Sequence, residues 1–240
     1  MSGTLDIAGT AALVGDPARA NILGALLDGR ALTASELAYF AHVSPQTASA
    51  HLAKLSEGNL ITMLRQGRNR YYRLASPPVV QMLEGIMAVA VSGTPHRRAV
   101  SRVDAAMRAA RTCYGHFAGR LGGALADSLG ARGHIVLTED GGEVTDSGTI
   151  FLSDFGVDLG AAQRRRRMFC RPCLDWTERR LHIGGAVGAA LAARCFDLGW
   201  CARTKDSRAL KITDAGRQGL EDVFGLSLDG PTATVLRRAS

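Results

Sequence analysis

The sequence has no uninterrupted apolar run that approaches the ~20 residues of a membrane-spanning helix. It also opens without a secretory leader, so we expect a cytoplasmic protein with no membrane partner. Cysteine is scarce and odd in number, at five in 240 residues. In a reducing compartment that count disfavours a disulfide framework and favours metal binding or thiol chemistry.

Lysine is nearly absent as well. Only Lys54, Lys205 and Lys211 accompany the arginines among 29 cations, and the formal net charge is +7. Arginine presents a planar fork of donors that matches phosphate oxygens, so this balance favours a polyanionic partner. A GC-rich genome would produce the same arginine bias, and the composition therefore needs support from a motif. The 46% hydrophobic content is enough to bury one core or two small ones.

Two short helices with a tight turn between them are predicted in the first ninety residues. Thr33 can cap the first helix, and Glu36 at its third position completes a capping box. After a three-residue turn, Ser44 can cap the second helix, with Pro45 at its first position and Gly58 at its end. Helical spacing gives the second helix an inward apolar stripe of Ala48, Leu52 and Leu55. This arrangement is the helix-turn-helix motif, in which the second helix reads DNA.

A β-hairpin with cations at its tip is predicted directly after the second helix. Residues 60–65 and 70–74 have the composition of strands, and the polar residues 66–69 form the turn between them. Such a hairpin behind a recognition helix is a wing, whose arginines reach phosphates or the minor groove while the helix enters the major groove. Gln46 can read adenine, and Arg68 can attract phosphate. The predicted DNA-binding residues are Ser44, Gln46, Thr47, Ser49, Ala50, Lys54, Arg65, Arg68, Asn69 and Arg70.

The segment SPQTASAHLAKLSEGNLITMLRQGRNRYYRLA resembles the ArsR/SmtB family of winged-helix transcriptional repressors. The family's recognition-helix pattern is matched at Ser44, Ser49, His51 and Leu52, and the resemblance covers roughly residues 8–92. It implies a homodimer that binds an inverted-repeat operator on double-stranded DNA and releases it when an effector arrives. The family's two metal sites are not matched, because residues 36–40 offer no thiol and the helix after the wing offers one carboxylate and no histidine. Sensing must therefore use other groups.

The second half is predicted to be a sensing and dimerisation domain. Residues 93–98, GTPHRR, mark a boundary, so the domains are expected at 1–92 and 93–240. A helix rich in small residues, which suit close helix contact, is predicted from about 99 to 129, a strand at 134–138 and a loop to about 148. Residues 182–225 then repeat the order helix, strand, turn, strand and capped helix, which predicts a second winged-helix-like unit. The fold class is therefore mainly α with small β-hairpins (α+β).

Two pairs of residues in this half could form a metal site. Cys113 and His116 lie three residues apart on the predicted helix, so one helical face presents both. Cys170 and Cys173 have the Cys-x-x-Cys spacing of zinc knuckles. Together they would form a Cys₃His set for zinc or another thiophilic metal, although the sequence does not show that the two pairs meet.

Three other interpretations of this region stay open. Arginines beside Cys170 favour a reactive thiolate, which would make it a redox or electrophile sensor. The cysteines could instead be small core residues. An organic effector is the third alternative, because aromatic and polar side chains could line a mostly apolar pocket. The residues expected to bind an effector are Cys113, Tyr114, His116, Cys173, Trp176 and His182.

The segments RTCYGHFAG and CLDWTERRLHIGG resemble a larger ArsR-like subgroup with an added C-terminal sensing domain. We therefore expect a dimeric, sequence-specific transcriptional repressor that is released by a metal ion, a thiol oxidant or electrophile, or a small organic ligand. The alternatives are a thiol-dependent enzyme built on Cys113, His116 and Cys173, and a DNA-binding protein without an effector. No nucleotide-binding loop or hydrolase elbow accompanies those residues, so an enzyme is not expected. The run Arg164–Arg167 could add phosphate contacts or simply face water.

Overall fold

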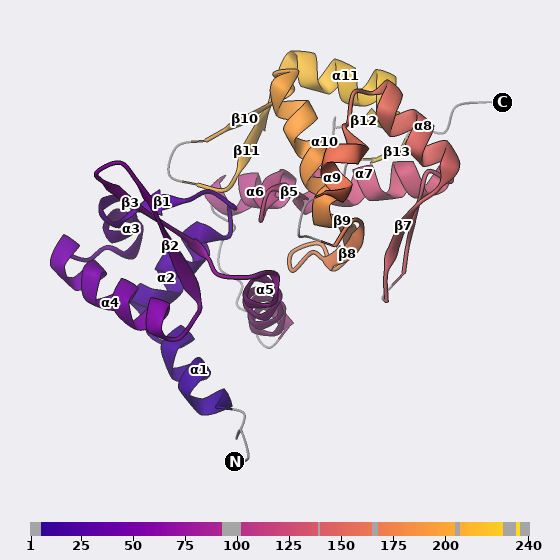
Figure 1. Cartoon of the computed structure of the whole chain (residues 1–240). Helices are drawn as coiled ribbons and strands as arrows, with labels where there is room; N and C mark the ends of the chain where they lie inside the picture. Colours follow the sequence, from indigo (N-terminus) through magenta and orange to yellow (C-terminus); the bar gives the residue numbers. More distant parts are fainter. Residues whose placement is uncertain are drawn as a thin grey trace. The chain divides into compact units, whose positions relative to one another are not determined.

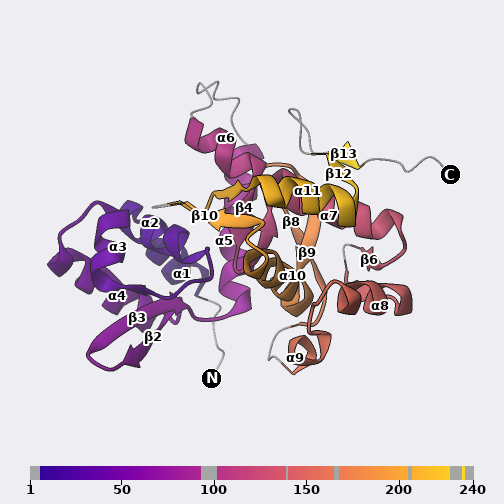
Figure 2. The same cartoon turned by 90° about the horizontal axis from the view of Figure 1, so that it is seen from above.

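The computed structural model describes residues 6–92, 102–138, 140–164, 168–204, 207–227 and 234–235. The chain divides into two compact units, Met1–Leu83 and Glu84–Ser240 (Figure 1, Figure 2). Both units combine helices with short antiparallel hairpins, and the first carries a helix-turn-helix, so the predicted fold class is confirmed. The predicted boundary segment, residues 93–98, lies outside the described residues, and the domain limits at 92 and 93 stay a prediction. No helix among the described residues is long and apolar enough to span a membrane.

The first unit is a winged helix-turn-helix. Its elements are α1 (Ile7–Val14), α2 (Pro17–Leu26), β1 (Leu32–Thr33), α3 (Ala34–Ala41), α4 (Pro45–Glu57), β2 (Ile61–Gln66) and β3 (Asn69–Leu74), and α5 (Pro77–Ser92) begins here and continues into the second unit. Helices α3 and α4 form the helix-turn-helix. The hairpin β2–β3 beside them in Figure 2 is the wing, and it pairs with β1 in a sheet of order β1-β3-β2.

The ends of α3 and α4 are capped as the sequence predicts. The Thr33 hydroxyl accepts from the backbone N–H of Glu36, and the Glu36 carboxylate accepts from the Thr33 N–H at 2.7 Å. His42 ends α3 in a left-handed conformation, with φ 55°, and turns the chain. The Ser44 hydroxyl then accepts from the N–H of Thr47 at 3.1 Å and starts α4. These caps fix the turn that positions α4.

Helix α4 is held in place by its apolar stripe. Ala48, Leu52 and Leu55 are at most 1% exposed, as the helical spacing predicts. The helix packs on α2 and α3, whose own leucines are buried beside it. Full burial of a leucine side chain stabilises a fold by roughly 1.5–3 kcal/mol, so the stripe determines which face of α4 points to solvent.

The second unit consists of helices separated by two-stranded antiparallel hairpins. Its elements are α6 (Arg102–Ala109), β4 (Arg111–Cys113), β5 (His116–Ala118), α7 (Gly119–Ala131), β6 (Ile135–Leu137), β7 (Gly142–Val144), α8 (Asp146–Asp154), α9 (Leu159–Gln163), β8 (Arg171–Leu174), β9 (Leu181–Gly184), α10 (Gly185–Asp197), β10 (Cys201–Arg203), β11 (Leu210–Ile212), α11 (Asp214–Phe224), β12 (Leu226–Ser227) and β13 (Thr234–Val235).

The long helix predicted over residues 99–129 is wrong, because a β-hairpin interrupts it. Tyr114 and Gly115 have φ of 47° and 93°, and positive φ at both central residues is the mark of a type I′ turn. The strands β4 and β5 pair around this turn, and Gly119, at φ 73°, starts α7. The loop predicted up to residue 148 is also wrong in part, since β7 pairs with β6 and α8 begins at Asp146.

The second unit contains the same order of elements twice. The hairpin β4–β5, helix α7, hairpin β6–β7 and helix α8 are matched by β8–β9, α10, β10–β11 and α11. Gly119 and Gly185 start the first helix of each copy, at φ 73° and 79°. Thr145 and Thr213 cap the second helix of each copy. Each threonine hydroxyl also donates to the carbonyl of a glycine that follows the preceding helix, at 2.7 and 2.8 Å.

The segment predicted to be winged-helix-like, residues 182–225, has the expected order of helix, hairpin and helix. Its first helix begins at Gly185 because residues 181–184 form β9. The counterpart of this segment within the chain is the first copy of the repeat, which has the same turns and caps. Its likeness to a winged helix stays a prediction.

The two copies share one hydrophobic core, to which α7 and α10 both contribute buried leucines. Helix α7 packs on β9, and α10 packs on β5, so each helix lies against the hairpin of the other copy. Glycines permit this approach: a Cβ on Gly122 would lie 3.4 Å from the Cβ of His182, and one on Gly188 would lie 3.1 Å from the Cβ of His116. The small residues of these helices therefore serve close packing within the unit.

Candidate functional site

The first candidate site is the exposed face of α4 together with the wing. All ten predicted DNA-binding residues are exposed, and those on α4 lie away from the buried stripe. Two hydroxyls are already bonded locally: Ser44 caps the helix, and Ser49 donates to the carbonyl of Pro45 at 2.9 Å. The longer Gln46 and Lys54 side chains are therefore better suited to reach base edges and phosphates. The role of this face in DNA binding stays a prediction.

The wing concentrates three cations at residues 65–70. Arg65 and Arg70 are directly opposed across the hairpin. Arg68 occupies the turn after Gly67, whose φ of 59° suits the first central position of a type II′ turn. Like charges directly opposite one another destabilise a pair of strands. An anion against the tip, such as a DNA phosphate, would relieve this repulsion.

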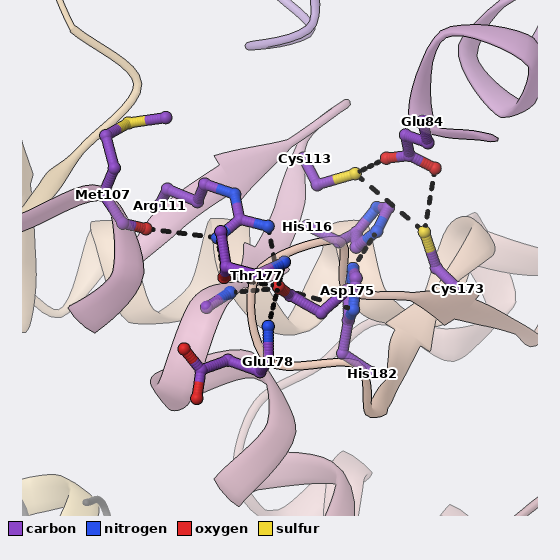
Figure 3. Close-up of polar contacts among 11 residues, drawn as sticks. Glu84, Met107, Arg111, Cys113, His116, Cys173, Asp175, Thr177, Glu178 and His182 are labelled. Carbon is purple, nitrogen blue, oxygen red and sulfur yellow. Dashed lines mark hydrogen bonds and ion pairs between the residues drawn. The ribbon is translucent and has the colours of Figure 1, made fainter. Parts of the chain in front are cut away.

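The second candidate site is a buried cluster in the second unit, to which each copy of the repeat contributes one cysteine and one histidine. Cys113 and His116 lie on β4 and β5, and Cys173 and His182 lie on β8 and β9 (Figure 3). One possible ligand atom from each of the four lies within 4.8 Å of the others. All four side chains are at most 4% exposed. Thiols and imidazoles that converge in this way are the donor set of structural zinc sites.

Two of the separations between these donor atoms fit a tetrahedral ion. The Sγ atoms of Cys113 and Cys173 are 3.9 Å apart, and the Nε2 atoms of His116 and His182 are 3.1 Å apart. With Zn–S near 2.3 Å and Zn–N near 2.0–2.1 Å, a regular tetrahedron has edges of about 3.8 Å between sulfurs and about 3.3 Å between nitrogens. These two separations match a zinc site, and every other pair of donor atoms in the cluster lies within 4.8 Å.

The register of two hairpins places each cysteine beside its histidine. In the first copy, the Tyr114-Gly115 turn makes Cys113 and His116 direct cross-strand partners. In the second copy, Cys173 and His182 are direct partners across a longer loop. Directly opposed residues of antiparallel strands have Cβ atoms about 4.5–5.5 Å apart on one face of the hairpin. Each hairpin thus presents one Cys–His pair. The prediction that Cys113 and His116 share one face of a helix is wrong, because they lie on two paired strands.

Cys170 is not part of the cluster, so the predicted Cys-x-x-Cys ligand pair is wrong. Its thiol lies in the apolar core of the unit, whereas Cys173 lies with Cys113 in a separate buried group. Side chains three positions apart in an extended segment point to opposite faces. The spacing that suits a knuckle turn therefore separates these two thiols at β8. His182, which the sequence assigned to an effector pocket, supplies the fourth donor.

The other predicted effector residues lie at the edge of the cluster. Tyr114 and Trp176 are half-buried residues of the two hairpin loops, and the Trp176 ring lies 4.8 Å from the guanidinium of Arg111. The rings of His116 and His182 face each other, with centroids 5.0 Å apart. This placement favours an ion over an organic effector. The arginine run gives no further evidence, because residues 165–167 lie outside the described residues.

Sequence reasoning missed two carboxylates that support the cluster. Glu84, on α5, accepts hydrogen bonds from both thiols (Figure 3). Asp175 is buried, accepts from Arg111 at 2.8 Å, and lies 4.0 Å from Nδ1 of His182. A carboxylate behind a ligating histidine fixes the orientation of its ring in many metal sites. The sequence does contain one indication of a special role for Glu84, since no other residue of α5 is charged.

The electrostatics of the cluster favour the metal-binding forms of Cys173 and His116, but not that of Cys113. Hydrogen bonds from Cys113, then from His116 and His182, lower the pKa of Cys173 well below its usual value. The same contact with Cys173, together with burial, raises the pKa of Cys113. Burial lowers the pKa of His116 and raises the pKa of Glu84 to about 8. A thiolate and a neutral imidazole are the forms in which cysteine and histidine coordinate metal ions.

Known proteins resemble the chain in its first unit and, in one case, over most of both units. The model of a helix-turn-helix domain family matches residues 14–63. The uncharacterized HTH-type transcriptional regulator YdfF of Bacillus subtilis (strain 168) is 40% identical over 216 residues, which are 90% of this chain and 96% of the relative. The homodimeric winged helix-turn-helix DNA-binding domain of Mb0332 from Mycobacterium bovis is 26% identical, with a TM-score of 0.35, over 41% of this chain and 97% of that structure. NolR from Sinorhizobium fredii is 28% identical, with a TM-score of 0.32, over 34% of this chain and 81% of that structure.

Proposed function

The chain belongs to the HTH-type transcriptional regulators, and from that premise we propose that it is a homodimeric repressor whose operator is released when a thiophilic metal ion binds in the second unit. The observation that carries the effector part is the convergence of four buried donors, the side chains of Cys113, His116, Cys173 and His182. The DNA-binding part is supported by the helix-turn-helix match and by the exposed face of α4 and the wing.

Each protomer would place α4 in a major groove of the operator. Gln46 carries the paired donor and acceptor that recognise adenine, while Lys54 and the wing arginines hold phosphates. Two copies related by a twofold axis read an inverted repeat, and their recognition helices must lie about one helical turn, ~34 Å, apart. An effector that changes this spacing by a few ångströms lowers the affinity for DNA, with a coupling free energy of about 1–3 kcal/mol in typical cases.

The donor set also indicates which ions would act as effectors. Thiolate and imidazole ligands suit zinc and softer ions, whereas magnesium and calcium prefer oxygen donors. Two thiolates balance the charge of a divalent ion, so the loaded cluster carries no net charge in its buried environment, where an uncompensated charge is costly. Because each copy of the repeat supplies half of the ligands, the ion would join the β4–β5 hairpin to the β8–β9 hairpin.

A disulfide switch is the second candidate, and one observation favours it. The thiols of Cys113 and Cys173 are in contact at 3.9 Å, so an oxidant that removed two electrons and two protons would join them. Both thiols are at most 4% exposed, which limits the access of oxidants and electrophiles. The ion is therefore the favoured effector.

Native mass spectrometry and fluorescence anisotropy test the proposal together. Reduced protein is examined with zinc and with a chelator, and its affinity is measured for a duplex that the protein has selected from random sequence. We expect a dimer that holds one zinc ion per chain and loses affinity for the duplex by about tenfold or more when zinc binds. Cys113→Ala should abolish zinc binding, whereas the matched control Cys170→Ala, which removes a buried thiol outside the cluster, should retain it.

The two candidate effectors give different results in this experiment. A reduced wild-type protein that binds no zinc, or one whose DNA affinity is the same with and without zinc, contradicts the metal proposal. Release of DNA by an oxidant that both Cys113→Ala and Cys173→Ala abolish, together with unchanged affinity in zinc, would support the disulfide switch instead.

A further inference from the structure

The hairpin β10–β11 is basic, whereas its counterpart in the first copy of the repeat, β6–β7, is acidic. Residues 201–212 contain four basic residues and one acidic residue, and residues 135–144 contain three acidic residues and no basic one. Lys211 occupies the position on β11 that Glu143 occupies on β7, because each is the middle residue of its strand and pairs with the middle residue of the partner strand. Both side chains are exposed. The two copies therefore present opposite charges to solvent at the same point of the same hairpin.

The fold itself does not require this positive charge. The two copies have the same order of elements and the same helix caps, so either sign of charge is compatible with the hairpin. Cations gathered on one hairpin repel one another, which opposes folding slightly. Lys211 has no ion-pair partner among the residues that the structure describes. The cations are therefore better explained by a partner outside the unit than by its packing.

The basic hairpin is held firmly on the unit. The N–H of Thr112, on β4, donates to the carbonyl of Arg208 at 3.0 Å, so the start of β11 is tied to a neighbouring strand. The guanidinium of Arg203, on β10, lies 4.8 Å from the centre of the Phe196 ring on α10. Such a contact between a cation and an aromatic ring is stabilising. The cations are thus positioned before a partner arrives, which lowers the entropic cost of binding one.

We infer that the β10–β11 hairpin is a second phosphate-binding surface of this regulator, with Arg203 and Lys211 as the residues that contact the backbone of duplex DNA. Phosphate contacts need only cations on a fixed support, and they position a protein without reading sequence. An acidic protein is the less favoured partner, because charged residues are depleted from the centres of protein–protein interfaces, whereas a lysine stands in the middle of β11. The inference goes beyond the proposed function but rests on its DNA-binding part.

The variant Lys211→Gln tests the surface through the salt dependence of DNA binding. One phosphate contact in each protomer of a dimer gives two contacts, so the slope of log affinity against log salt should become shallower by about 1.8. If the affinity extrapolated to 1 M salt is unchanged, the affinity for a random-sequence duplex should fall by about 60-fold at 0.1 M. The melting temperature should stay that of the wild type, because the side chain is exposed. Arg217→Gln, which removes one exposed cation from α11, is the control of equal charge and should keep the wild-type slope.

Lysine footprinting gives a second, independent measurement on the full-length wild type. The chain has only three lysines, of which Lys54 lies on α4 and Lys211 on β11. A reagent that acetylates exposed lysines is applied with and without saturating duplex, and mass spectrometry reads each site. We expect the duplex to protect Lys211 to the same extent as Lys54. One experiment thus reports on the recognition helix and on the hairpin separately.

The results distinguish this inference from the proposed function. A wild-type slope in Lys211→Gln, or protection of Lys54 without protection of Lys211, would overturn the hairpin assignment and leave the proposed function standing. Equal flattening of the slope by Arg217→Gln would also overturn it, because overall charge would then account for the attraction. A wild-type protein that binds no duplex and protects neither lysine would instead contradict the DNA-binding part of the proposed function.

Discussion

Replacing Arg68 with glutamine at the tip of the wing should weaken the binding of the protein to any DNA duplex, and most strongly at low salt. In the proposed dimer, Arg68 of each protomer contacts one DNA phosphate. The dimer therefore makes two such contacts, which the substitution removes. The slope of log affinity against log salt is about −0.9 per contact on B-DNA, so the slope should become shallower by about 1.8. If the affinity extrapolated to 1 M salt is unchanged, the loss is about 60-fold at 0.1 M.

The opposed pair in the same wing gives this reasoning a second measurable quantity. Arg65 and Arg70 lie directly across from each other, and such like-charge pairs are unfavourable by about 0.2–1 kcal/mol. Arg70→Gln should therefore leave the free energy of unfolding unchanged or raise it slightly, while the affinity for DNA falls. A cation that served only the fold would show the two quantities falling together.

Fluorescence anisotropy with a random-sequence duplex, between about 50 and 200 mM salt, measures the slope, since phosphate contacts do not depend on the operator. Arg217→Gln removes one exposed cation from α11 and is the control for net charge, so its slope should stay close to that of the wild type. If Arg68→Gln and Arg217→Gln flatten the slope equally, overall charge attracts the duplex and the assignment of the wing is refuted.

Three further changes test the recognition helix, the repeat and the support of the cluster. Gln46→Ala should cost about 1–3 kcal/mol at one operator position and relax its base preference, as read by competition between duplex variants, with the salt slope unchanged. Gly188→Ala should lower both the melting temperature and the zinc affinity, because a Cβ there would overlap the backbone of β9 and press on His116. The control Gly130→Ala, at an exposed position of α7, should instead stabilise the protein by about 0.5–1 kcal/mol. Asp175→Asn should destabilise by about 3–5 kcal/mol at neutral pH, because it leaves Arg111 buried without its carboxylate. Although burial opposes the charged form, Arg111 and neighbouring hydrogen bonds lower the pKa of Asp175 well below its usual value; the advantage of the wild type should therefore be complete above pH ~4 and shrink as the pH falls towards the folded pKa, in urea titrations at a series of pH values.

The winged helix-turn-helix is predictable from the sequence because its signals are local. The capping box at Thr33, the cap at Ser44 and the stripe through Leu52 each involve residues within a few positions of one another. Helix caps and helical periodicity act over the same short range, so the residues that interact can be identified as neighbours in the sequence. The order of elements and the buried face in this unit are confirmed.

The cluster in the second unit is predictable only in part, because strand pairing and the contact between hairpins are not local. The spacing of Cys113 and His116 suits a helical face as well as a tight hairpin, and the positive φ of Tyr114 that decides between them has no strong signal in a non-glycine residue. The meeting of this pair with Cys173 joins residues 60 positions apart. A comparison of the second half with itself is more informative, since it aligns the two Arg-x-Cys segments and places His182 opposite His116.

The internal repeat gives a physical reason for an ion to serve as a switch in this fold. A site with all of its ligands in one hairpin would bind metal in any arrangement of the unit. A site divided between two copies is complete only when both hairpins are in contact, so ion affinity and that contact are thermodynamically linked. Glu84 adds a contribution from α5, because its carboxyl group contacts the same two sulfur atoms. The binding free energy of the proposed ion would therefore be available to change the relation between the two hairpins and α5. A ligand shifts an equilibrium only through such a difference in its affinity for the two states.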